Sequence, residues 1–327
     1  MFKTLILYAL GFIKNKTFFP SLFNNIFFIV LNKVKYENIV WIHLQEHIGD
    51  IVACEPVSLY AKKTYPNAKI FWITKIQYES LVKCNPNIDQ VLTVTCILEW
   101  ILLKKIIKKD KIIDLHIHNR RDSYFPISLT NPNSYSITLE NYYSYGSILE
   151  SFSLSAGIPK LNAQPIFHFC QNNTENTLEK YIVFHCSSNE SIRNWDTDKW
   201  LQLLKKLTHN NYTIVEIGLS NVIKTTNSRY LNYCGKKDFQ DIAKIISNAE
   251  LFIGIDSGFA HFANALKIPS VILLGHYRIF KMYMPYTGFF ADNINDMVIQ
   301  HNGLPSQIPV DIVIQKAIKL LNNKEIN

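Results

Sequence analysis

A short segment in the last third of the chain combines side chains that can bind an anion. The apolar run Leu251–Ile255 ends at Asp256, Ser257 and Gly258, and an apolar-faced helix is predicted to begin there with His261 on its first turn. Ser257 can cap this helix, and the unpaired N–H groups of a first helical turn bind phosphates. The segment therefore predicts a site for a phosphate-containing ligand, with a capped helix and a surface histidine as the competing interpretation.

Asp50 is the candidate for proton transfer. It follows Gly49 and the predicted strand Ile39–Leu44, at a point where a helix is expected. Ligands of open α/β sheets bind beyond the carboxyl ends of the strands, so a carboxylate placed there can remove a proton from a bound hydroxyl. Capping of the following helix is the alternative role for this side chain.

Ser187, Ser188 and Arg193 form a third group, which follows the predicted strand Tyr181–His185. A guanidinium can hold two phosphate oxygens at once, so Arg193 suits a departing diphosphate. This group therefore also predicts binding of a phosphorylated ligand.

The segment from Asp114 to Asp122 could in principle bind a metal ion, because it contains His116 and His118 near two carboxylates. On a strand, however, the two histidines share one face and Asp122 falls beyond the strand end. We therefore expect no metal site there.

The chain is long enough for two α/β domains, and its pattern indicates them. The expected strands are Ile39–Leu44, Lys69–Ile73, Gln90–Val94, Lys111–Ile117, Tyr181–His185, Thr213–Ile217, Leu251–Ile255 and Ser270–Leu274. The expected helices are Ile51–Thr64, Leu98–Lys109, Ser147–Ala156, Thr197–Thr208, Phe239–Asn248, Gly258–Leu266 and Val310–Leu321. Neither half contains GxGxxG or GxxxxGK[ST], which argues against dinucleotide oxidoreductases and P-loop enzymes.

Four motifs, in order, resemble bacterial glycosyltransferase family 9, the heptosyltransferase family. They are the Gly-Asp signature with its Pro and Tyr-Pro-x-Ala (Gly49, Asp50, Pro56, Tyr65, Pro66, Ala68), the Asn-Pro-x-Ile-Asp segment (Asn85 to Asp89), the hydroxyl pair with a basic residue and Trp195, and Asp-Ser-Gly-x-x-His with Ala263, Ala265, Leu266 and Pro269. The resemblance implies an α/β fold of GT-B type, in which two Rossmann-like domains with parallel sheets face a central cleft.

This resemblance also implies a division of the chain. We expect an apolar and basic segment (residues 1–37), an acceptor-side domain (38–165), a linker (166–180), a nucleotide-sugar donor domain (181–308) and a C-terminal helix (309–327). By the same resemblance, Asp50 is the general base of an inverting transfer and Arg193 stabilises the leaving group. The other expected contacts are Ser187, Ser188, Asp256, Ser257, Gly258, His261 and Glu216 for the donor, and Asp114, His116, Arg120 and Arg121 for an anionic acceptor.

Composition is consistent with this interpretation. The net charge of +8 favours a polyanionic partner or an anionic membrane surface, and no nucleic-acid-binding motif is present. Six cysteines without CxxC pairs suggest reduced thiols in a cytosol. The apolar runs Thr4–Ile13 and Phe18–Val30 are each shorter than the ~20 residues that span a bilayer. They suggest two helices lying on the inner leaflet, or alternatively a helical cap on the first domain.

The sequence thus predicts an inverting heptosyltransferase that moves heptose from ADP-heptose to a lipopolysaccharide core or related lipid-linked glycan. It would act in the cytoplasm, peripherally on the inner membrane, and without a metal, because a helix dipole together with Arg193 can take the place of a metal ion at the diphosphate. After Gly275 the chain has His276-Tyr277-Arg278 where the family commonly has Pro-Thr-Asp-Pro, which leaves the donor sugar open. The alternatives are another nucleotide sugar, a protein acceptor, or a non-catalytic module that binds glycan or nucleotide.

Overall fold

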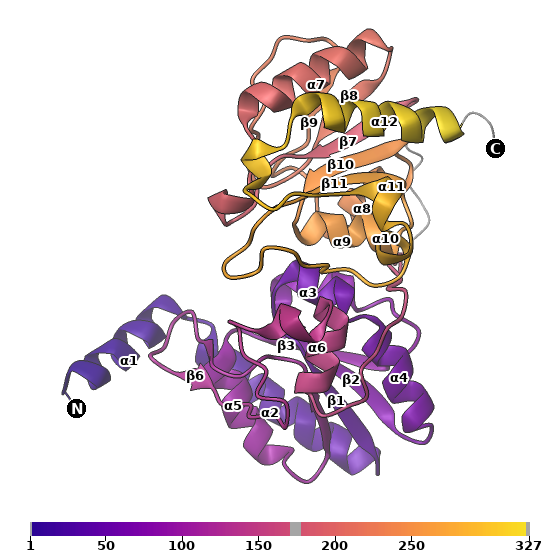
Figure 1. Cartoon of the computed structure of the whole chain (residues 1–327). Helices are drawn as coiled ribbons and strands as arrows, with labels where there is room; N and C mark the ends of the chain where they lie inside the picture. Colours follow the sequence, from indigo (N-terminus) through magenta and orange to yellow (C-terminus); the bar gives the residue numbers. More distant parts are fainter. Residues whose placement is uncertain (1, 171–177, 325–327) are drawn as a thin grey trace. The chain divides into compact units, whose positions relative to one another are not determined.

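The computed structural model describes residues 2–170 and 178–324. The chain divides into two compact units, Met1–Ala163 and Gln164–Asn327, each with its own parallel sheet (Figure 1). The central part of the predicted linker, residues 171–177, lies outside the described residues.

The first unit contains a four-stranded parallel sheet in the order β3-β2-β1-β4. The strands are β1 (Ile39–His43), β2 (Lys69–Lys75), β3 (Gln90–Val94) and β4 (Lys111–Asp114). The helices are α1 (Phe2–Lys14), α2 (Phe18–Lys35), α3 (Ile48–Ala53), α4 (Pro56–Thr64), α5 (Ile97–Ile106) and α6 (Ile148–Ser155). Trp41, Phe71 and Trp100 lie at the centre of the core that α2 and α5 form with one face of this sheet. The unit also has a short antiparallel pair, β5 (Arg120–Arg121) with β6 (Ser128–Leu129), and two 3₁₀ helices, Ile76–Leu81 and Tyr142–Tyr145.

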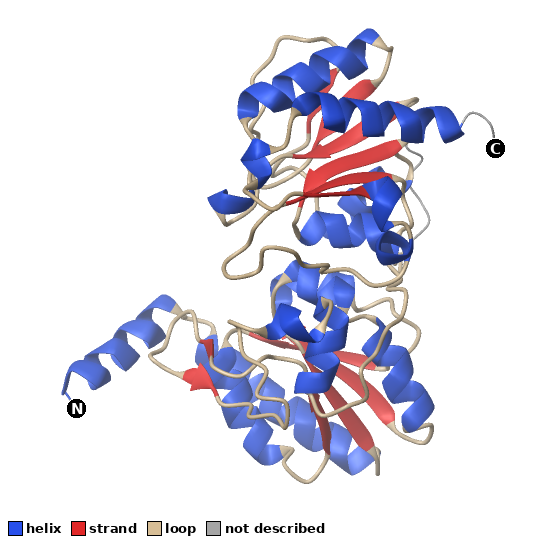
Figure 2. Ribbon diagram, viewed as in Figure 1, coloured by secondary structure: helices blue, strands red, loops and turns tan. Residues whose placement is uncertain are grey.

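The second unit also has a parallel sheet, and its strands are among those drawn in red in Figure 2. It has six strands in the order β12-β11-β10-β7-β8-β9. The strands are β7 (Tyr181–His185), β8 (Thr213–Glu216), β9 (Tyr230–Asn232), β10 (Leu251–Ile255), β11 (Ser270–Leu274) and β12 (Val298–Gln300). The helices are α7 (Thr197–His209), α8 (Phe239–Ser247), α9 (Gly258–Ala265), α10 (Phe289–Asp292), α11 (Ile294–Met297) and α12 (Val310–Lys324), with 3₁₀ helices at Ser191–Arg193 and Pro305–Gln307. Helices α7 and α12 enclose a core with Phe184 and Ile253, while α8 and α9 pack on the other face.

Most predicted elements are present, and four strands have the predicted bounds. The predicted helix Ile51–Thr64 is instead two helices, α3 and α4, and Pro56 is the first residue of α4. Proline lacks the N–H that a helix interior needs but fits the first helical position. The predicted helix is therefore interrupted before Pro56, where α4 begins. The strand predicted over Lys111–Ile117 ends at Asp114. Beyond that point the Asn131 side chain, rather than a neighbouring strand, donates hydrogen bonds to the carbonyls of Asp114 and His116.

The structure contains elements that the sequence analysis missed, namely β9, β12, the β5–β6 pair, α10, α11 and the 3₁₀ helices. All of them are short. Segments of two to six residues show neither a helical nor an alternating period, so apolar patterning does not detect them.

Both apolar runs before residue 37 are helical. Helix α2 packs into the first unit, where Phe18 and Ile29 are buried and Asn25 donates hydrogen bonds to the Glu99 carboxylate and the Thr93 carbonyl. Over the part of the chain that the structure describes, no helix is both long and apolar enough to cross a bilayer.

The cysteines differ in part from expectation. Cys54, Cys96, Cys186 and Cys234 are free and buried, as predicted for core thiols. Cys84 and Cys170 are disulfide-bonded, so the expectation of six reduced thiols is wrong for these two.

Candidate active site

The carboxyl ends of β7, β8 and β10 meet at one edge of the second sheet, because the strands are parallel neighbours. The segments that begin with Ser187 and with Asp256 follow two of these strand ends. This edge is the position at which open α/β sheets bind ligands. The structure therefore brings together, within one unit, the residues that the sequence assigned to the donor.

Asp256 is the centre of a buried polar cluster and is only 3% exposed. Its Oδ2 accepts hydrogen bonds from the Tyr283 hydroxyl at 2.7 Å and from Arg193 Nη1 at 3.3 Å, and its Oδ1 accepts one from the Tyr286 hydroxyl at 3.3 Å. Burial, together with the adjacent carboxylate, raises the pKa of both tyrosines well above the usual value. Asp256 thus fixes the segment after β11 and orients Arg193.

Arg193 is a positioned cation at the rim of this cluster. Its side chain is 21% exposed, and the guanidinium carbon lies 4.0 Å from the centre of the Tyr277 ring. Glu190 lies 3.7 Å from Nη2 and also accepts a hydrogen bond from the Tyr277 hydroxyl at 3.0 Å. A guanidinium held by a ring and two carboxylates has little freedom left to lose when it binds a phosphate.

The amino terminus of α9 offers hydrogen-bond donors beside this cation. Ser257 is the N-cap residue and does not use its side chain as a cap. Its Oγ is buried and has no hydrogen-bond partner among residues 2–170 and 178–324. Gly258 begins the helix, and His261 is buried with its ring 4.6 Å from that of Tyr286. A buried hydroxyl at a helix amino terminus suits an anionic ligand, which would supply the acceptor that the protein does not.

The hydroxyl pair after β7 divides into two roles. Ser188 closes its own loop, because its Oγ donates to the Glu190 carbonyl at 2.7 Å and its N–H donates to the Asn194 side chain at 2.9 Å. The Ser187 side chain is half-buried and forms no hydrogen bond within the described residues. Ser187 is therefore the member of the pair that is open to a ligand.

Glu216 is buried at the end of β8 and holds the loop that follows. Its carboxylate accepts hydrogen bonds from the backbone N–H groups of Val222 and Ile223 at 2.6 and 3.2 Å and from the Tyr230 hydroxyl at 2.5 Å. These bonds tie the Glu216 carboxylate to the loop that follows β8. A contact from Glu216 to a donor ribose stays a prediction.

His185 is a buried histidine that the sequence analysis did not select. It ends β7, and its Nδ1 has no hydrogen-bond partner in the described part of the chain. Burial lowers its pKa to about 4, so the ring is neutral near pH 7. The sequence signal that could have identified His185 is its position at the carboxyl end of a predicted strand.

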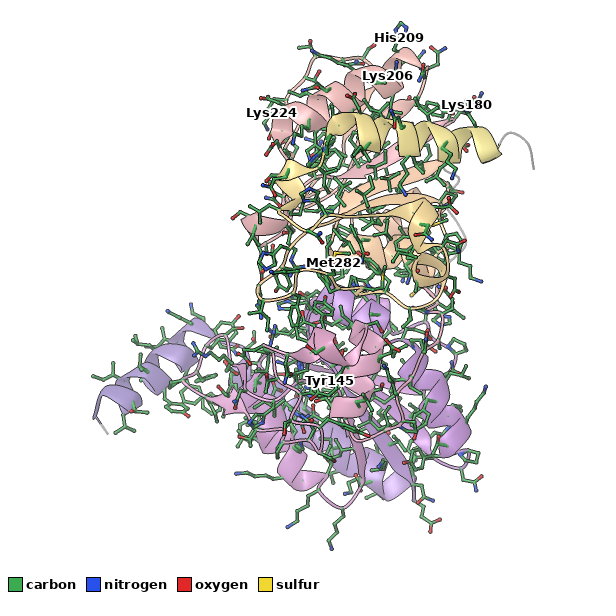
Figure 3. All side chains as sticks on the ribbon, viewed as in Figure 1. Tyr145, Lys180, Lys206, His209, Lys224 and Met282 are labelled. Carbon is green, nitrogen blue, oxygen red and sulfur yellow. The ribbon has the colours of Figure 1, made fainter. Side chains whose placement is uncertain are left out.

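The pKa of His185 gives a prediction for stability. Because the folded-state pKa of about 4 lies below the unfolded value of ~6.5, only the unfolded chain binds this proton as the pH falls between them. His185 thus lowers the free energy of unfolding by up to about 3 kcal/mol across that window, and the effect is absent above it. We expect the urea midpoint of unfolding to fall less steeply in His185→Gln than in the wild type as the pH is lowered through the acid range, which we call the acid limb. His209→Gln, at the exposed end of α7 (Figure 3), should leave that limb unchanged, and equal slopes would contradict the assignment.

In the first unit, Asp50 lies on the first turn of α3. Its Oδ2 accepts a hydrogen bond from the His47 N–H at 3.2 Å, which completes a capping box at the start of that helix. Asp50 is half-buried, and this is its side chain's only hydrogen bond in the described residues. The cap therefore orients the carboxylate and leaves one oxygen open to a hydroxyl.

His43 and Asp114, the last residues of β1 and β4, form a buried pair. Asp114 Oδ1 lies 2.8 Å from His43 Nδ1, and Oδ2 accepts hydrogen bonds from Trp100 at 3.1 Å and from Lys104 at 2.9 Å. Although burial opposes it, the charges of His43 and Lys104 hold the pKa of Asp114 well below the usual value. His116, also buried, accepts a hydrogen bond from the Gln45 N–H at 3.1 Å.

The two arginines expected to contact the acceptor differ in environment. Arg120 contacts Glu46 at 3.3 Å and hydrogen-bonds His47, next to the start of α3, whereas Arg121 is exposed. Glu46 is also paired with Lys75, and the two cations lower its pKa despite burial. This cluster holds the Arg120 guanidinium beside His47, which is three residues before Asp50 in the sequence.

The histidines of the His-x-His segment have separate partners. His118 Nδ1 accepts a hydrogen bond from the Asn131 N–H at 3.0 Å, whereas His116 Nε2 accepts one from the Gln45 N–H. Over the described residues, no group of three or more His, Cys, Asp or Glu side chains could hold a metal ion.

The comparison with protein families supplies the deciding observation. A model of glycosyltransferase family 9 (heptosyltransferase) matches residues 89–287, which is more than half of the chain. This chain belongs to glycosyltransferase family 9. It is 28% identical over 162 residues to lipopolysaccharide heptosyltransferase 3 of Escherichia coli K12, a match that covers 44% of this chain and 47% of that protein. The chain thus spans about half the length of the curated relatives that it matches.

Solved structures show the same fold. A family 9 glycosyltransferase from Veillonella parvula superposes with a TM-score of 0.66 at 18% identity, covering 88% of this chain and 98% of that one. ADP-heptose lipopolysaccharide heptosyltransferase II of E. coli has a TM-score of 0.64 at 15% identity, covering 88% and 99%. The E. coli glycosyltransferase TibC, described as iron-containing, has a TM-score of 0.56 at 15% identity, covering 77% and 61%. The predicted GT-B fold class, with two Rossmann-like domains, is confirmed.

Proposed function

We propose that this protein is an inverting glycosyltransferase that moves heptose from ADP-heptose to a lipopolysaccharide core or a related lipid-linked surface glycan. The observation that carries the proposal is the amino terminus of α9 at Ser257, where a buried hydroxyl without a hydrogen-bond partner in the described residues lies next to Asp256, which pairs with Arg193. Family membership supports the reaction class, and the similar fold of the E. coli ADP-heptose lipopolysaccharide heptosyltransferase II supports the donor.

Each unit has its own part in the proposed reaction. Asp50 removes the proton from the acceptor hydroxyl, whose oxygen then forms a bond to the anomeric carbon. The bond from that carbon to the diphosphate breaks, and its electron pair leaves with ADP. Attack opposite the leaving group inverts the anomeric centre.

The developing charge on ADP is balanced by three groups of the second unit. Arg193 holds phosphate oxygens, Ser257 donates its hydroxyl, and the first N–H groups of α9 add the positive end of a helix dipole, worth about 1–2 kcal/mol in a partly buried site. Ser187 contacts the same phosphates, and His261 lies beneath them. We propose that these groups act without a metal ion, although TibC, which has a similar fold, is described as iron-containing.

The acceptor is proposed to bind the first unit. Arg120 and Arg121 supply positive charge for a phosphorylated or acidic glycan, and Asp114 and His116 shape the sheet edge below. Because such acceptors are lipid-linked, the protein would work at the cytoplasmic face of the inner membrane.

A thermal-shift panel tests the donor. A ligand at one hundred times its Kd stabilises the folded chain by about 2.7 kcal/mol, so ADP should raise the melting temperature more than GDP, UDP or CMP. Ser257→Ala should weaken the ADP response, whereas Ser228→Ala, at an exposed position, should not. A response to UDP or GDP alone would indicate a donor sugar linked to that nucleotide instead of ADP. No response to any nucleotide would favour a non-catalytic binding module.

Another donor sugar is the second candidate, and one segment favours it. His276-Tyr277-Arg278 replaces the family's usual sequence, and Tyr277 and Arg278 are tied to Glu190 at 3.0 and 3.4 Å. A segment rebuilt in this way can change which sugar is accepted while the diphosphate contacts stay the same.

A further inference from the structure

The outward faces of α1 and α2 are apolar, which is unusual for helices at the surface of a protein. Eleven large apolar side chains between residues 5 and 34 are exposed, including Phe23 at 68%, Phe27 at 64% and Val34 at 84%. We name this set the apolar ridge: Leu5, Ile6, Leu7, Leu10, Ile13, Phe19, Phe23, Phe27, Val30, Leu31 and Val34. A surface helix normally presents polar side chains to water, so a ridge of this size indicates a covering partner.

Helix α2 is apolar on two opposite faces. Phe18, Asn25, Ile29 and Asn32 are buried against the first unit, whereas the ridge residues of α2 recur every three or four positions on the other side. A recurrence at this spacing forms one continuous stripe along a helix. The core therefore accounts for the inner face of α2 and leaves the outer one unexplained.

Helix α1 is attached along one side only. Tyr8 and Phe12 contact the Phe125 ring with centroids 5.9 and 4.9 Å apart, and Gly11 lies so close to Phe125 that a Cβ would clash at 2.6 Å. Its other sides carry exposed ridge residues, and Figure 1 shows the helix projecting from the first unit. The ridge thus continues from α2 onto α1, where Phe12 stacks on Phe19 at 5.0 Å.

A polar network holds the two helices in place. Asn15 donates to Thr95 at 3.0 Å, Thr95 donates to Glu99 at 2.8 Å, and Asn25 donates to the same carboxylate at 2.7 Å. Glu99 is fully buried on α5. Because the hydrogen bonds fix the inner sides, the ridge faces outward in a defined orientation.

The charged side chains of α1 and α2 themselves have one sign. Residues 1–36 contain five lysines and neither aspartate nor glutamate. Lys14 and Lys16 are exposed at the turn joining α1 and α2, and Lys35 is exposed at the far end. Exposed Lys108 and Lys109 lie next to Asp110, which pairs with Lys33 of α2 at 3.1 Å. An apolar stripe bordered by cations matches the acyl and headgroup layers of an anionic leaflet.

We propose that the apolar ridge docks on an anionic lipid bilayer, with α2 lying flat in the interface and α1 inserted beside it. Neither helix is both long and apolar enough to cross the bilayer, so the proposed contact is with one leaflet. A second copy of this chain is a poorer occupant, because a symmetric pair would bring its lysine borders together. The purpose of this docking rests on the proposed function: it would bring the first unit, where the acceptor is proposed to bind, to a lipid-linked substrate.

Vesicle co-sedimentation tests the docking directly. The full-length chain should pellet with vesicles of equal parts phosphatidylcholine and phosphatidylglycerol, and less with phosphatidylcholine alone. Phe23→Ser with Phe27→Ser should lower the partition coefficient at least about tenfold. Leu59→Ser with Ile76→Ser, which are also apolar and exposed on the same unit, should bind like the wild type.

Charge is tested in parallel. Lys14→Gln with Lys16→Gln should weaken binding to the anionic vesicles, whereas Lys205→Gln with Lys206→Gln on α7 should not. Melting temperatures of all variants confirm folding, since every changed side chain is exposed.

The outcomes separate the docking from the proposed reaction. Equal pelleting of the wild type and the Phe23/Phe27 variant would overturn the proposal, as would a wild type that stays in the supernatant. A concentration-dependent dimer that this variant disperses, with no vesicle binding, would assign the ridge to a second copy. Because the assay contains neither nucleotide nor glycan, vesicle binding would stand even if no sugar transfer were found.

Discussion

Asp50→Asn is expected to lower kcat for sugar transfer by about 10²–10⁴-fold, the range typical of a lost general base. Asparagine cannot take the acceptor proton. Its side-chain oxygen can still accept the hydrogen bond from the His47 N–H that now starts α3, so the local fold should survive. The melting temperature should therefore change little while turnover falls, and the measurement is steady-state ADP release.

Glu150→Gln is the matched control for this variant. Glu150 completes a capping box at the start of α6 in the same unit, where its carboxylate accepts a hydrogen bond from the Ser147 N–H at 2.8 Å. Full activity in Glu150→Gln beside a loss in Asp50→Asn would assign the loss to proton transfer. Near-normal turnover in Asp50→Asn would remove Asp50 from catalysis and leave it as a helix cap.

Asp256→Ala is expected to have the largest effect on stability. The change removes the carboxylate that accepts hydrogen bonds from the Tyr283 and Tyr286 hydroxyls and that pairs with Arg193. Breaking a buried ion pair by removing one partner costs about 3–5 kcal/mol, and the partial exposure of Arg193 places our expectation near the lower end. The urea midpoint of unfolding should fall accordingly, and ADP should stabilise the variant less than the wild type.

Tyr283→Phe separates the two functions of this cluster. It removes one hydrogen bond at a cost of about 1 kcal/mol but keeps the Asp256–Arg193 pair. If the pair orients Arg193 for the diphosphate, Tyr283→Phe should keep most of the ADP response that Asp256→Ala loses. An ADP response that is unchanged in Asp256→Ala would show that the donor does not use this cluster.

The sheet strands were the most predictable part of the fold. Strands β7, β10 and β11 are buried along their whole length and appear in the sequence as short apolar runs ended by turn residues. The turn after β10 was also predictable, because Asp-Ser-Gly before an apolar-faced helix has few other interpretations. Local pattern thus located the strand ends that position the proposed donor site.

The partners of the site residues were not predictable in the same way. Asp256 is covered by tyrosines 27 and 30 residues further along the chain, and Glu99 is buried among donors from α2, more than 70 residues earlier. Such contacts depend on how distant segments pack, and no period in the sequence encodes them. For the same reason, the sequence suggested a ligand role for Glu216 but gave no sign of the loop that occupies it.

Acceptor-dependent release of ADP from ADP-heptose, followed with wild type and Asp50→Asn side by side, tests the central claim most directly. The proposed reaction predicts that the wild type releases ADP when a lipopolysaccharide-core acceptor is added, that the new linkage has the inverted anomeric configuration, and that Asp50→Asn is slower by the factor given above. Absence of ADP release with every acceptor, from a chain that is folded and binds ADP, would contradict it.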